Sequence, residues 1–268
     1  MRTKTFLVVL ASLVFAVSAH ADTAVKCPFK TLGSCPTIGC AKPNTPLAAT
    51  NSLKRNTAIK GSSTPLSFDD MQALQDDLDK EFANGPVIVQ GQKVSSPRGM
   101  NAVARKILLS GLKAGNKKFS EGDYVELTGF IASKKLPPHP NTGESVNCKL
   151  KDEPSNDYHI NITPEKNSDE TKGVVVEMIP QDSHRKNKSW DLKKLDAIQE
   201  KQLQVKIRGR LFLDSEHKPN TGGNGGGNPR RFAIWELHPI KAFFVCPSGS
   251  CSKSSDWKTL EDWTPNLK

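Results

Sequence analysis

The chain has 268 residues, of which 38 are lysine or arginine and 28 are aspartate or glutamate, so its formal net charge at pH 7 is +10. A basic balance of this size favours anionic partners, such as nucleic acid, glycans or lipid head groups, although many basic surfaces are simply solvated. One long apolar run stands at the start and no second one follows, so the rest of the chain is not expected to contain a transmembrane segment.

The N-terminus has the pattern of a secretory signal peptide. Arg2 and Lys4 make its start basic, the run over 6–17 is uncharged, and Ala19 and Ala21 provide the small side chains of a cleavage site. We expect cleavage near Ala21 and a secreted or periplasmic protein. Loss of Arg2 and Lys4 from the 38 basic residues leaves 36 basic against 28 acidic side chains, a mature formal charge of +8.

Changes in composition divide the chain into five segments. After the signal peptide comes a part rich in Cys, Pro, Thr, Asn and Lys without periodicity, which indicates an extension tied by disulfides. A helical lead-in, a barrel and a tail follow it. The expected limits are 1–21 for the signal peptide, 22–63 for the Cys/Pro-rich extension, 64–120 for the lead-in, 121–246 for the barrel and 247–268 for the C-terminal tail.

Six cysteines in an exported chain predict disulfide bonds. Six cysteines allow fifteen pairings, so the connectivity is open at this point. Bonds between Cys35 and Cys40 and between Cys246 and Cys251 would each close a small turn. Cys27 would then be left to pair with Cys148. A zinc site at the first three is less expected, because no Cys-x-x-Cys pair or nearby histidine cluster accompanies them. The disulfide candidates are Cys27, Cys35, Cys40, Cys148, Cys246 and Cys251.

The lead-in shows two helical patterns. Ser67 is a suitable N-cap for a helix over 68–82, in which apolar residues recur at helical spacing. Ser96 and Pro97 can begin a second helix that ends near Gly115. Its apolar face is expected to hold Val103, Ile107, Leu108 and Leu112, and one short strand is expected before it, over 87–94.

From residue 121 onward, apolar residues recur at every second position, as in strands with one buried face. The pattern is clearest over 203–213, where lysine and arginine alternate with valine, isoleucine and leucine. A helix is expected over 189–200, because Ser189 can cap it and apolar residues follow at helical spacing. The five strands are expected over 124–131, 147–162, 173–179, 203–213 and 232–245.

Three strands, a helix and two strands, in that order, are the pattern of the OB-fold, a five-stranded Greek-key barrel. A jelly roll needs more strands, and a lipocalin-type barrel would not place its helix there. The predicted fold class is therefore mainly β: an OB-like barrel with a helix between strands three and four, preceded by a small α-helical extension that contains cysteines.

Five short motifs lie along the barrel region, at Glu144–Cys148, Asp157–His159, Val175–Pro180, Asp214–His217 and Trp235–Pro239. In this order they resemble a group of exported bacterial proteins of unassigned function with an OB-like domain. The resemblance covers about 121–245, and more faintly 35–40 and 51–55. It implies a fold and an export route but no activity. The insert over 218–231 looks like an expansion of a shorter turn.

An OB barrel binds ligands on the face of strands two and three, and through the loops between strands one and two and strands four and five. These loops are expected over 134–145 and 216–231. Single-strand binders also stack bases on aromatic side chains, and strands two and three provide only Tyr158. A row of basic residues could follow a phosphate backbone, with ordinary solvated charges as the alternative. Its members are Lys206, Arg208, Arg210, Arg230 and Arg231.

Together, the signal-peptide pattern, the OB-like barrel and the basic row predict an exported binding or envelope-associated module without catalytic activity. Its expected partner is an anionic polymer such as nucleic acid or a glycan. No nucleophile elbow, phosphate loop, dinucleotide fingerprint or EF-hand is present in the sequence. No catalytic residue and no cofactor is predicted for such a module. A further interpretation is a structural partner of another exported protein, with the N-terminal cystine segment as the contact.

An alternative function depends on acidic and imidazole side chains. Strands two, three and five could bring His159, Glu177 and His238 together, and two histidines with a carboxylate suit zinc or another divalent ion. A water bound to such an ion could attack a phosphodiester, as in a metal-dependent hydrolase or nuclease. The opposing interpretation is a buried polar cluster that only braces the strands. Other members expected nearby are Asp157, Asp214, His217 and Glu236.

Overall fold

The computed structural model describes residues 27–133, 137–221 and 230–265. The predicted signal peptide and its cleavage near Ala21 concern a part of the chain outside these ranges. Within them, no helix has the length and apolar character needed to cross a membrane.

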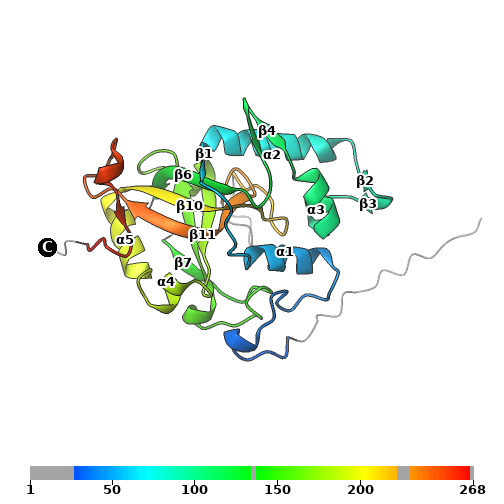
Figure 1. Cartoon of the computed structure of the whole chain (residues 1–268), viewed down its shortest axis with the longest axis horizontal. Coiled ribbons are helices and arrows are strands. Elements are labelled where there is room, and N and C mark those ends of the chain that lie inside the picture. Colours follow the sequence, from blue (N-terminus) through cyan, green and yellow to red (C-terminus); the bar gives the residue numbers. More distant parts are fainter. Residues whose placement is uncertain (1–26, 134–136, 222–229, 266–268) are drawn as a thin grey trace, which may run out of the picture.

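Five strands close into a barrel. They are β6 (Tyr124–Ile131), β8 (Asp157–Thr163), β9 (Val174–Met178), β10 (Gln204–Leu213) and β11 (Trp235–Val245). Antiparallel pairings join β8 to β6, β6 to β10, β10 to β11 and β8 to β9, and a parallel pairing of β11 with β9 completes the circle. The helix α5 (Leu192–Lys201) connects β9 to β10. The predicted mainly β fold, with its helix between the third and fourth strands, is therefore confirmed (Figure 1).

The alternation in β10 decides which of its side chains are buried. Val205 and Ile207 are buried, whereas Lys206 between them is partly exposed, because successive side chains of a strand point to opposite faces. At Gly209 the register of β10 against β11 shifts, and a Cβ there would lie 3.0 Å from the Cα of Ile240. The glycine therefore allows the two strands to approach closely at this irregularity. By contrast, every residue of β8 and β9 is buried.

Short elements surround the barrel. The helices are α1 (Pro46–Lys54), α2 (Phe68–Ala83), α3 (Ala102–Leu108) and α4 (Ser183–Lys186). The short strands are β1 (Thr64–Leu66), β2 (Val87–Val89), β3 (Gln92–Val94), β4 (Leu112–Ala114), β5 (Lys117–Phe119), β7 (His139–Asn141) and β12 (Lys258–Thr259). β1, β7 and β12 extend the barrel sheet beside β6, β8 and β11, whereas β2–β3 and β4–β5 form separate hairpins.

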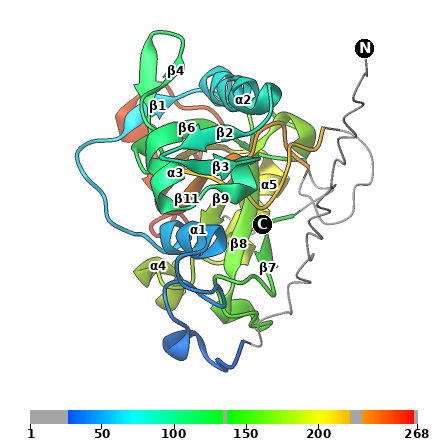
Figure 2. The same cartoon turned by 90° about the vertical axis from the view of Figure 1, so that its right-hand side faces the viewer.

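The helices of the extension and the lead-in gather on one side of the barrel. Figure 1 shows α2 along the top of the molecule and α5 at the opposite end from the β2–β3 hairpin. In both views α1 lies directly below α3, close to the barrel strands (Figure 2). α1, from a segment without apolar periodicity, thus packs against α3, and its last residue Lys54 pairs with Glu144 in the loop before Cys148.

The second half of the lead-in differs from the prediction. The expected helix ends at Leu108 instead of near Gly115, and the following residues form the β4–β5 hairpin. Gly111 and Gly115 both have positive φ, at 66° and 60°, which favours turns over a continuing helix. The strand expected over 87–94 is likewise a hairpin, β2–β3.

The buried face of α3 also differs from the expected one. Val103 and Ile107 are 47% and 46% exposed, whereas Arg105 is 1% exposed. Arg105 is buried because its guanidinium forms an ion pair with Glu121, which lies beyond the next hairpin. A helical period cannot show a partner at that distance in the sequence. The predicted face was therefore wrong for Val103 and Ile107, whereas Leu108 and Leu112 pack against the core as expected.

All six cysteines form disulfides, as is typical of proteins from oxidising compartments such as the periplasm or the cell exterior. The expected closure of the turn between Cys246 and Cys251 is confirmed. The other two pairings were exchanged in the prediction. The chain joins Cys27 to Cys40 and Cys35 to Cys148.

The contact of the extension with the barrel explains this exchange. Gly39 has a φ of 58°, and a Cβ there would lie 2.0 Å from the carbonyl oxygen of Ser145. The amide of Cys40 also donates to that carbonyl at 3.0 Å. The segment around Gly39 and Cys40 therefore packs against the chain just before Cys148. This contact brings Cys35 close enough to Cys148 to form the disulfide.

Candidate metal centre and adjoining cavity

Three neighbouring strands bring carboxylate and imidazole groups together inside the barrel. The pairing of β8 with β9 aligns His159 with Glu177, and the parallel pairing of β9 with β11 places His238 on the other side of Glu177. Asp157, Glu177 and His238 each offer a ligand atom, and these atoms lie within 4.8 Å of one another. All three side chains are buried. We refer to Asp157, Glu177 and His238 as the acidic–histidine cluster.

The spacing within the acidic–histidine cluster suits donors that share one ion. Nδ1 of His238 lies 3.3 Å from Oε2 of Glu177, and its Nε2 lies 3.5 Å from Oδ2 of Asp157. Two ligands of a tetrahedral zinc ion stand roughly 3.3 Å apart when each bond is about 2.0 Å. One imidazole nitrogen could bind the ion while the other donates to a nearby carboxylate, an arrangement common around metals.

The cluster differs from the predicted ligand set in one member. His159 is buried, with its Nδ1 3.7 Å from Oε1 of Glu177, but it does not belong to the group whose ligand atoms converge. Its ring stacks on His139 of β7, with 5.3 Å between the ring centroids. Burial, followed by the nearby guanidinium of Arg231, lowers the pKa of His159 well below its usual 6.5, so this imidazole is neutral. Asp157 takes its place.

Several buried polar atoms in this region have no hydrogen-bond partner among the described residues. Leaving such a group unpaired costs about 1–3 kcal/mol, and native proteins contain few of them. A cation between the carboxylates and the imidazole would bind several of these atoms at once. They are Oε2 of Glu144, Oδ2 of Asp157, Nε2 of His159, Oε2 of Glu177, Oε2 of Glu236 and both ring nitrogens of His238.

The charges of this region are unbalanced. The side chains of Lys54 and Arg231 are the permanent cations that contact its carboxyl groups in the described structure: Lys54 pairs with Glu144 at 3.0 Å, and Arg231 pairs with two further carboxylates. Burial, reinforced by the nearby carboxylates, raises the pKa of Glu177 well above 4.5 despite the opposing charge of Lys54. A divalent cation would supply the missing positive charge. The five carboxyl groups are those of Glu144, Asp157, Glu177, Asp214 and Glu236.

A histidine and an aspartate form a second pair beside the cluster. Nδ1 of His217 lies 2.5 Å from Oδ2 of Asp214, and the same carboxylate accepts a hydrogen bond from Arg231 at 2.8 Å. The hydrogen bond to Asp214 raises the pKa of His217 above 6.5. Burial opposes ionisation of Asp214, but its hydrogen bond with His217 and the charges of Lys54 and Arg231 outweigh that cost and hold its pKa well below 3.8. The pair therefore favours a protonated imidazole on an ionised carboxylate.

A cavity of about 270 Å³ opens beside these residues. It shares Lys54 and Glu144 with the charged region, and His217 lies on its border. Its walls come from α1, from β7, from the loop before Cys148 and from the turn after β10. Its lining residues are Leu47, Thr50, Asn51, Lys54, Asn141, Glu144, Ser145, Val146, Glu216 and His217.

The sequence did not identify Lys54 and Glu144 as members of the site. Both residues lie in stretches that support the resemblance to exported OB-like proteins, at 51–55 and 144–148. A buried lysine in α1 has no periodic signal of its own, because the buried residues of that helix are Ala48, Thr50, Asn51 and Lys54. Their position in those motifs was the one available indication.

The predicted basic row is largely occupied by contacts within the protein. Nε of Arg208 lies 2.6 Å from Oε2 of Glu126, and Arg210 donates to the carbonyl of Ala58 at 2.5 Å. The ammonium group of Lys206 lies 4.5 Å from the centre of the Trp257 ring. These contacts compete with a bound phosphate backbone for the same donors.

The two arginines at the end of the β10–β11 loop have separate surroundings. Arg230 pairs with Asp169 at 3.2 Å and with Glu170 at 3.4 Å. The side chain of Arg231 is fully buried, so the prediction that it contacts an external ligand is corrected to a role inside the charged region. Gly222 to Pro229 of the same loop lie outside the described residues.

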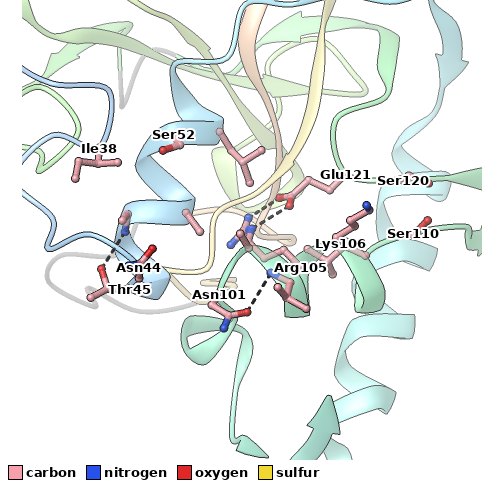
Figure 3. Close-up of a pocket in the computed structure, with 16 residues that line it drawn as sticks. Ile38, Asn44, Thr45, Ser52, Asn101, Arg105, Lys106, Ser110, Ser120 and Glu121 are labelled. Atoms are coloured by element: carbon pink, nitrogen blue, oxygen red, sulfur yellow. Dashed lines mark hydrogen bonds and ion pairs between the residues drawn. The ribbon is translucent and has the colours of Figure 1, made fainter. Parts of the chain in front are cut away.

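A larger cavity, of about 640 Å³, lies between α1 and α3 (Figure 3). Figure 3 shows the guanidinium of Arg105 directed to the carboxylate of Glu121 at its wall. Arg105 also donates to Ser215 at 3.0 Å and contacts Thr50 at 3.4 Å, so its donors are already engaged. Most of the remaining lining is apolar or small, as at Leu53 and Val103.

Comparison with known proteins leaves the resemblance to exported OB-like proteins a prediction. No protein family, curated protein or solved structure matches this chain.

Proposed function

We propose that the chain is a divalent-metal-dependent hydrolase whose ion is held by Asp157, Glu177 and His238. The observation that supports this proposal is that Asp157, Glu177 and His238 have buried, unpartnered atoms and offer ligand atoms within 4.8 Å of one another. Two carboxylates and one imidazole are a donor set that zinc and related ions accept, and three protein ligands leave a position for water.

The chemistry follows from the properties of such an ion. A bound divalent ion lowers the pKa of its water to about 7, which provides a nucleophile near neutral pH. The cavity lined by Lys54, Glu144 and His217 supplies space for a substrate, and it adjoins the charged region through Lys54 and Glu144. Lys54 and His217 line the cavity together with Glu144 and Glu216. The mature formal charge of +8, 36 basic against 28 acidic side chains, favours a substrate that carries phosphate. We therefore propose phosphodiesters as the substrate class.

The compartment is part of the proposal. The three disulfides and the signal-peptide pattern of the first 21 residues together support action outside the cytoplasm, in a periplasm or after secretion. A non-catalytic module for nucleic acid or glycans has less support, because Arg208 and Arg230 already pair with carboxylates and Arg231 is buried.

The test begins with protein produced by export and purified without a His-tag. Elemental analysis is expected to find about one divalent ion per chain, and removal of the ion should lower Tm by roughly 5–10 °C. This estimate corresponds to an ion at a hundredfold excess over its Kd, which adds about 2.7 kcal/mol to the free energy of unfolding. The metal-loaded protein should cleave the p-nitrophenyl ester of thymidine 5′-phosphate.

A matched pair of variants assigns the ion to its site. Glu177→Gln should bind no ion and show no change of Tm on metal addition, whereas Glu81→Gln, at an exposed position of α2, should behave as the wild type. The proposal is wrong if metal-free and metal-treated wild type melt at the same temperature and neither sample cleaves the diester.

A further inference from the structure

We propose that His217 is the general acid of this hydrolase, and that its Nε2 donates a proton to the leaving oxygen of a phosphodiester bound in the 270 Å³ cavity. This inference rests on the proposed function, because it needs the ion to activate the attacking water. It assigns the proton donor and the type of leaving group, which the acidic–histidine cluster alone does not specify.

The first argument is the orientation of the imidazole. Nδ1 of His217 is held at 2.5 Å by Asp214, whose side chain is 3% exposed, so this edge of the ring faces the protein interior. Nε2 lies on the opposite edge of the ring. The His217 side chain is 24% exposed and borders the cavity, so Nε2 is the ring atom available to a bound molecule.

The second argument is the rigid connection between this imidazole and the proposed ion. Asp214 accepts a hydrogen bond from Arg231 at 2.8 Å, and Arg231 also donates to Oε1 of Glu236. Oε2 of Glu236 lies 3.7 Å from Nδ1 of His238. Hydrogen bonds thus hold His217 to Asp214, Arg231 and Glu236, and Glu236 lies next to the cluster, as the placement of a proton donor near the ion requires.

The charge state of the imidazole agrees with this role. The charged groups that act on His217 are Asp214, Arg231 and Glu236, and the charge of Lys54 helps to lower the pKa of Asp214. The hydrogen bond and charge of Asp214 outweigh burial and the Arg231 guanidinium, so the pKa of His217 is raised. A larger fraction of the imidazole is therefore protonated near neutral pH, which an acid catalyst needs.

The size and lining of the cavity limit the substrate. Ligand pockets for whole drug-sized molecules range over about 300–1,000 Å³, so 270 Å³ accommodates one phosphodiester group with part of its substituents. Lys54 and a protonated His217 provide positive charge beside the carboxyl groups of Glu144 and Glu216, and Asn141 and Ser145 add polar side chains. This lining favours a small diester or the end of a strand over the interior of a folded polymer.

The proposed step is balanced as a hydrolysis. Water activated at the cluster forms a new bond to phosphorus and loses one proton to solvent. The bond from phosphorus to the leaving oxygen breaks, and its electron pair stays on that oxygen. The imidazolium Nε2 proton moves to the leaving oxygen, and His217 regains a proton from solvent. One diester and one water yield one phosphomonoester and one alcohol.

Two diesters with different leaving groups test the assignment in the full-length, metal-loaded protein. Loss of the general acid should matter for a dinucleotide, whose alkoxide leaving group needs a proton, and should matter little for thymidine 5′-(p-nitrophenyl) phosphate, whose phenolate does not. His217→Gln is expected to lower kcat on the dinucleotide by about 10²–10⁴-fold and on the p-nitrophenyl ester by less than about tenfold. Its metal content should equal that of the wild type.

His184→Gln is the matched control. His184 also places Nδ1 against an aspartate, Asp182, at 2.7 Å, but it lies on α4 and does not line the cavity. The His184→Gln variant should cleave both diesters at the wild-type rates. The role of His217 is overturned if His217→Gln affects neither substrate, or lowers both rates equally, while metal content and wild-type activity are intact. A wild type that holds no metal and cleaves neither diester overturns the hydrolase itself, and this role with it.

Discussion

At the scale of single residues, Arg231 connects the two halves of the site. It contacts Asp214, which holds His217, and Glu236, which lies beside His238. A buried guanidinium between two carboxylates is costly to bring out of water, but removing it leaves both carboxylates without a counter-charge. Its position just after a glycine-rich insert suggested an external phosphate contact, and its complete burial gives it a different role.

We expect Arg231→Met to destabilise the protein by about 3–5 kcal/mol, because it leaves buried carboxylates unpaired. The measurement is urea denaturation of metal-free protein at neutral pH. Arg230→Met is the matched control: the Arg230 side chain is 37% exposed, so loss of its pairs with Asp169 and Glu170 should cost less than about 1 kcal/mol. Equal losses for the two variants would show that burial of Arg231 is not the cause.

At the scale of elements, the two helices α1 and α2 illustrate what a sequence pattern can reveal. α2 begins after Ser67, as predicted, and Ser67 and Asp70 form a reciprocal capping box. α1 was not predicted because its buried residues include Thr50, Asn51 and Lys54, which have no apolar period. A helix whose buried side chains are polar cannot be recognised from an apolar period in the sequence. It can be recognised only from the tertiary structure, which shows the groups that those side chains contact.

The capping box leads to a prediction about pH. Burial opposes ionisation of Asp70, but hydrogen bonds from the ammonium of Lys117, at 2.8 Å, and from Ser67 outweigh it and lower the pKa of this carboxyl. A lowered folded-state pKa stabilises the protein above the unfolded pKa of about 3.9 and loses that effect as pH falls through the folded value. The stability difference between wild type and Asp70→Asn should therefore be full near pH 6 and shrink below about pH 4.

Thermal unfolding from pH 6 down to pH 3 measures this difference. Asp76→Asn serves as the control, since Asp76 lies on the exposed side of the same helix. A gap between wild type and Asp70→Asn that stays constant over the whole range would contradict the role given to the capping box and Lys117.

At the scale of the whole molecule, the disulfide between Cys35 and Cys148 attaches the extension, and with it α1, to the barrel. It closes a sequence separation of 113 residues, whereas the bond between Cys246 and Cys251 closes one of 5. The two bonds therefore constrain the unfolded chain very differently. The long link is also the one that keeps Lys54 beside the cavity.

Replacement of both Cys35 and Cys148 by serine should cost about 4–5 kcal/mol, against about 2 kcal/mol for the same change at Cys246 and Cys251, if loss of chain entropy dominates. Guanidinium denaturation of the two double variants measures the difference. A smaller loss for the long link than for the short one would show that residual structure in the unfolded extension, and not loop length, governs its stability.

The sequence by itself determined the mainly β barrel, its helix between strands three and four, and the proximity of Glu177 and His238. These follow from local periods of two and 3.6 residues and from the strand order that such a barrel imposes. Only the tertiary structure decided that Asp157 takes the place expected for His159, that Arg231 is buried, and that the extension delivers Lys54. Those outcomes depend on packing between segments far apart in the chain, where burial and unpaired charge select partners that no local pattern encodes.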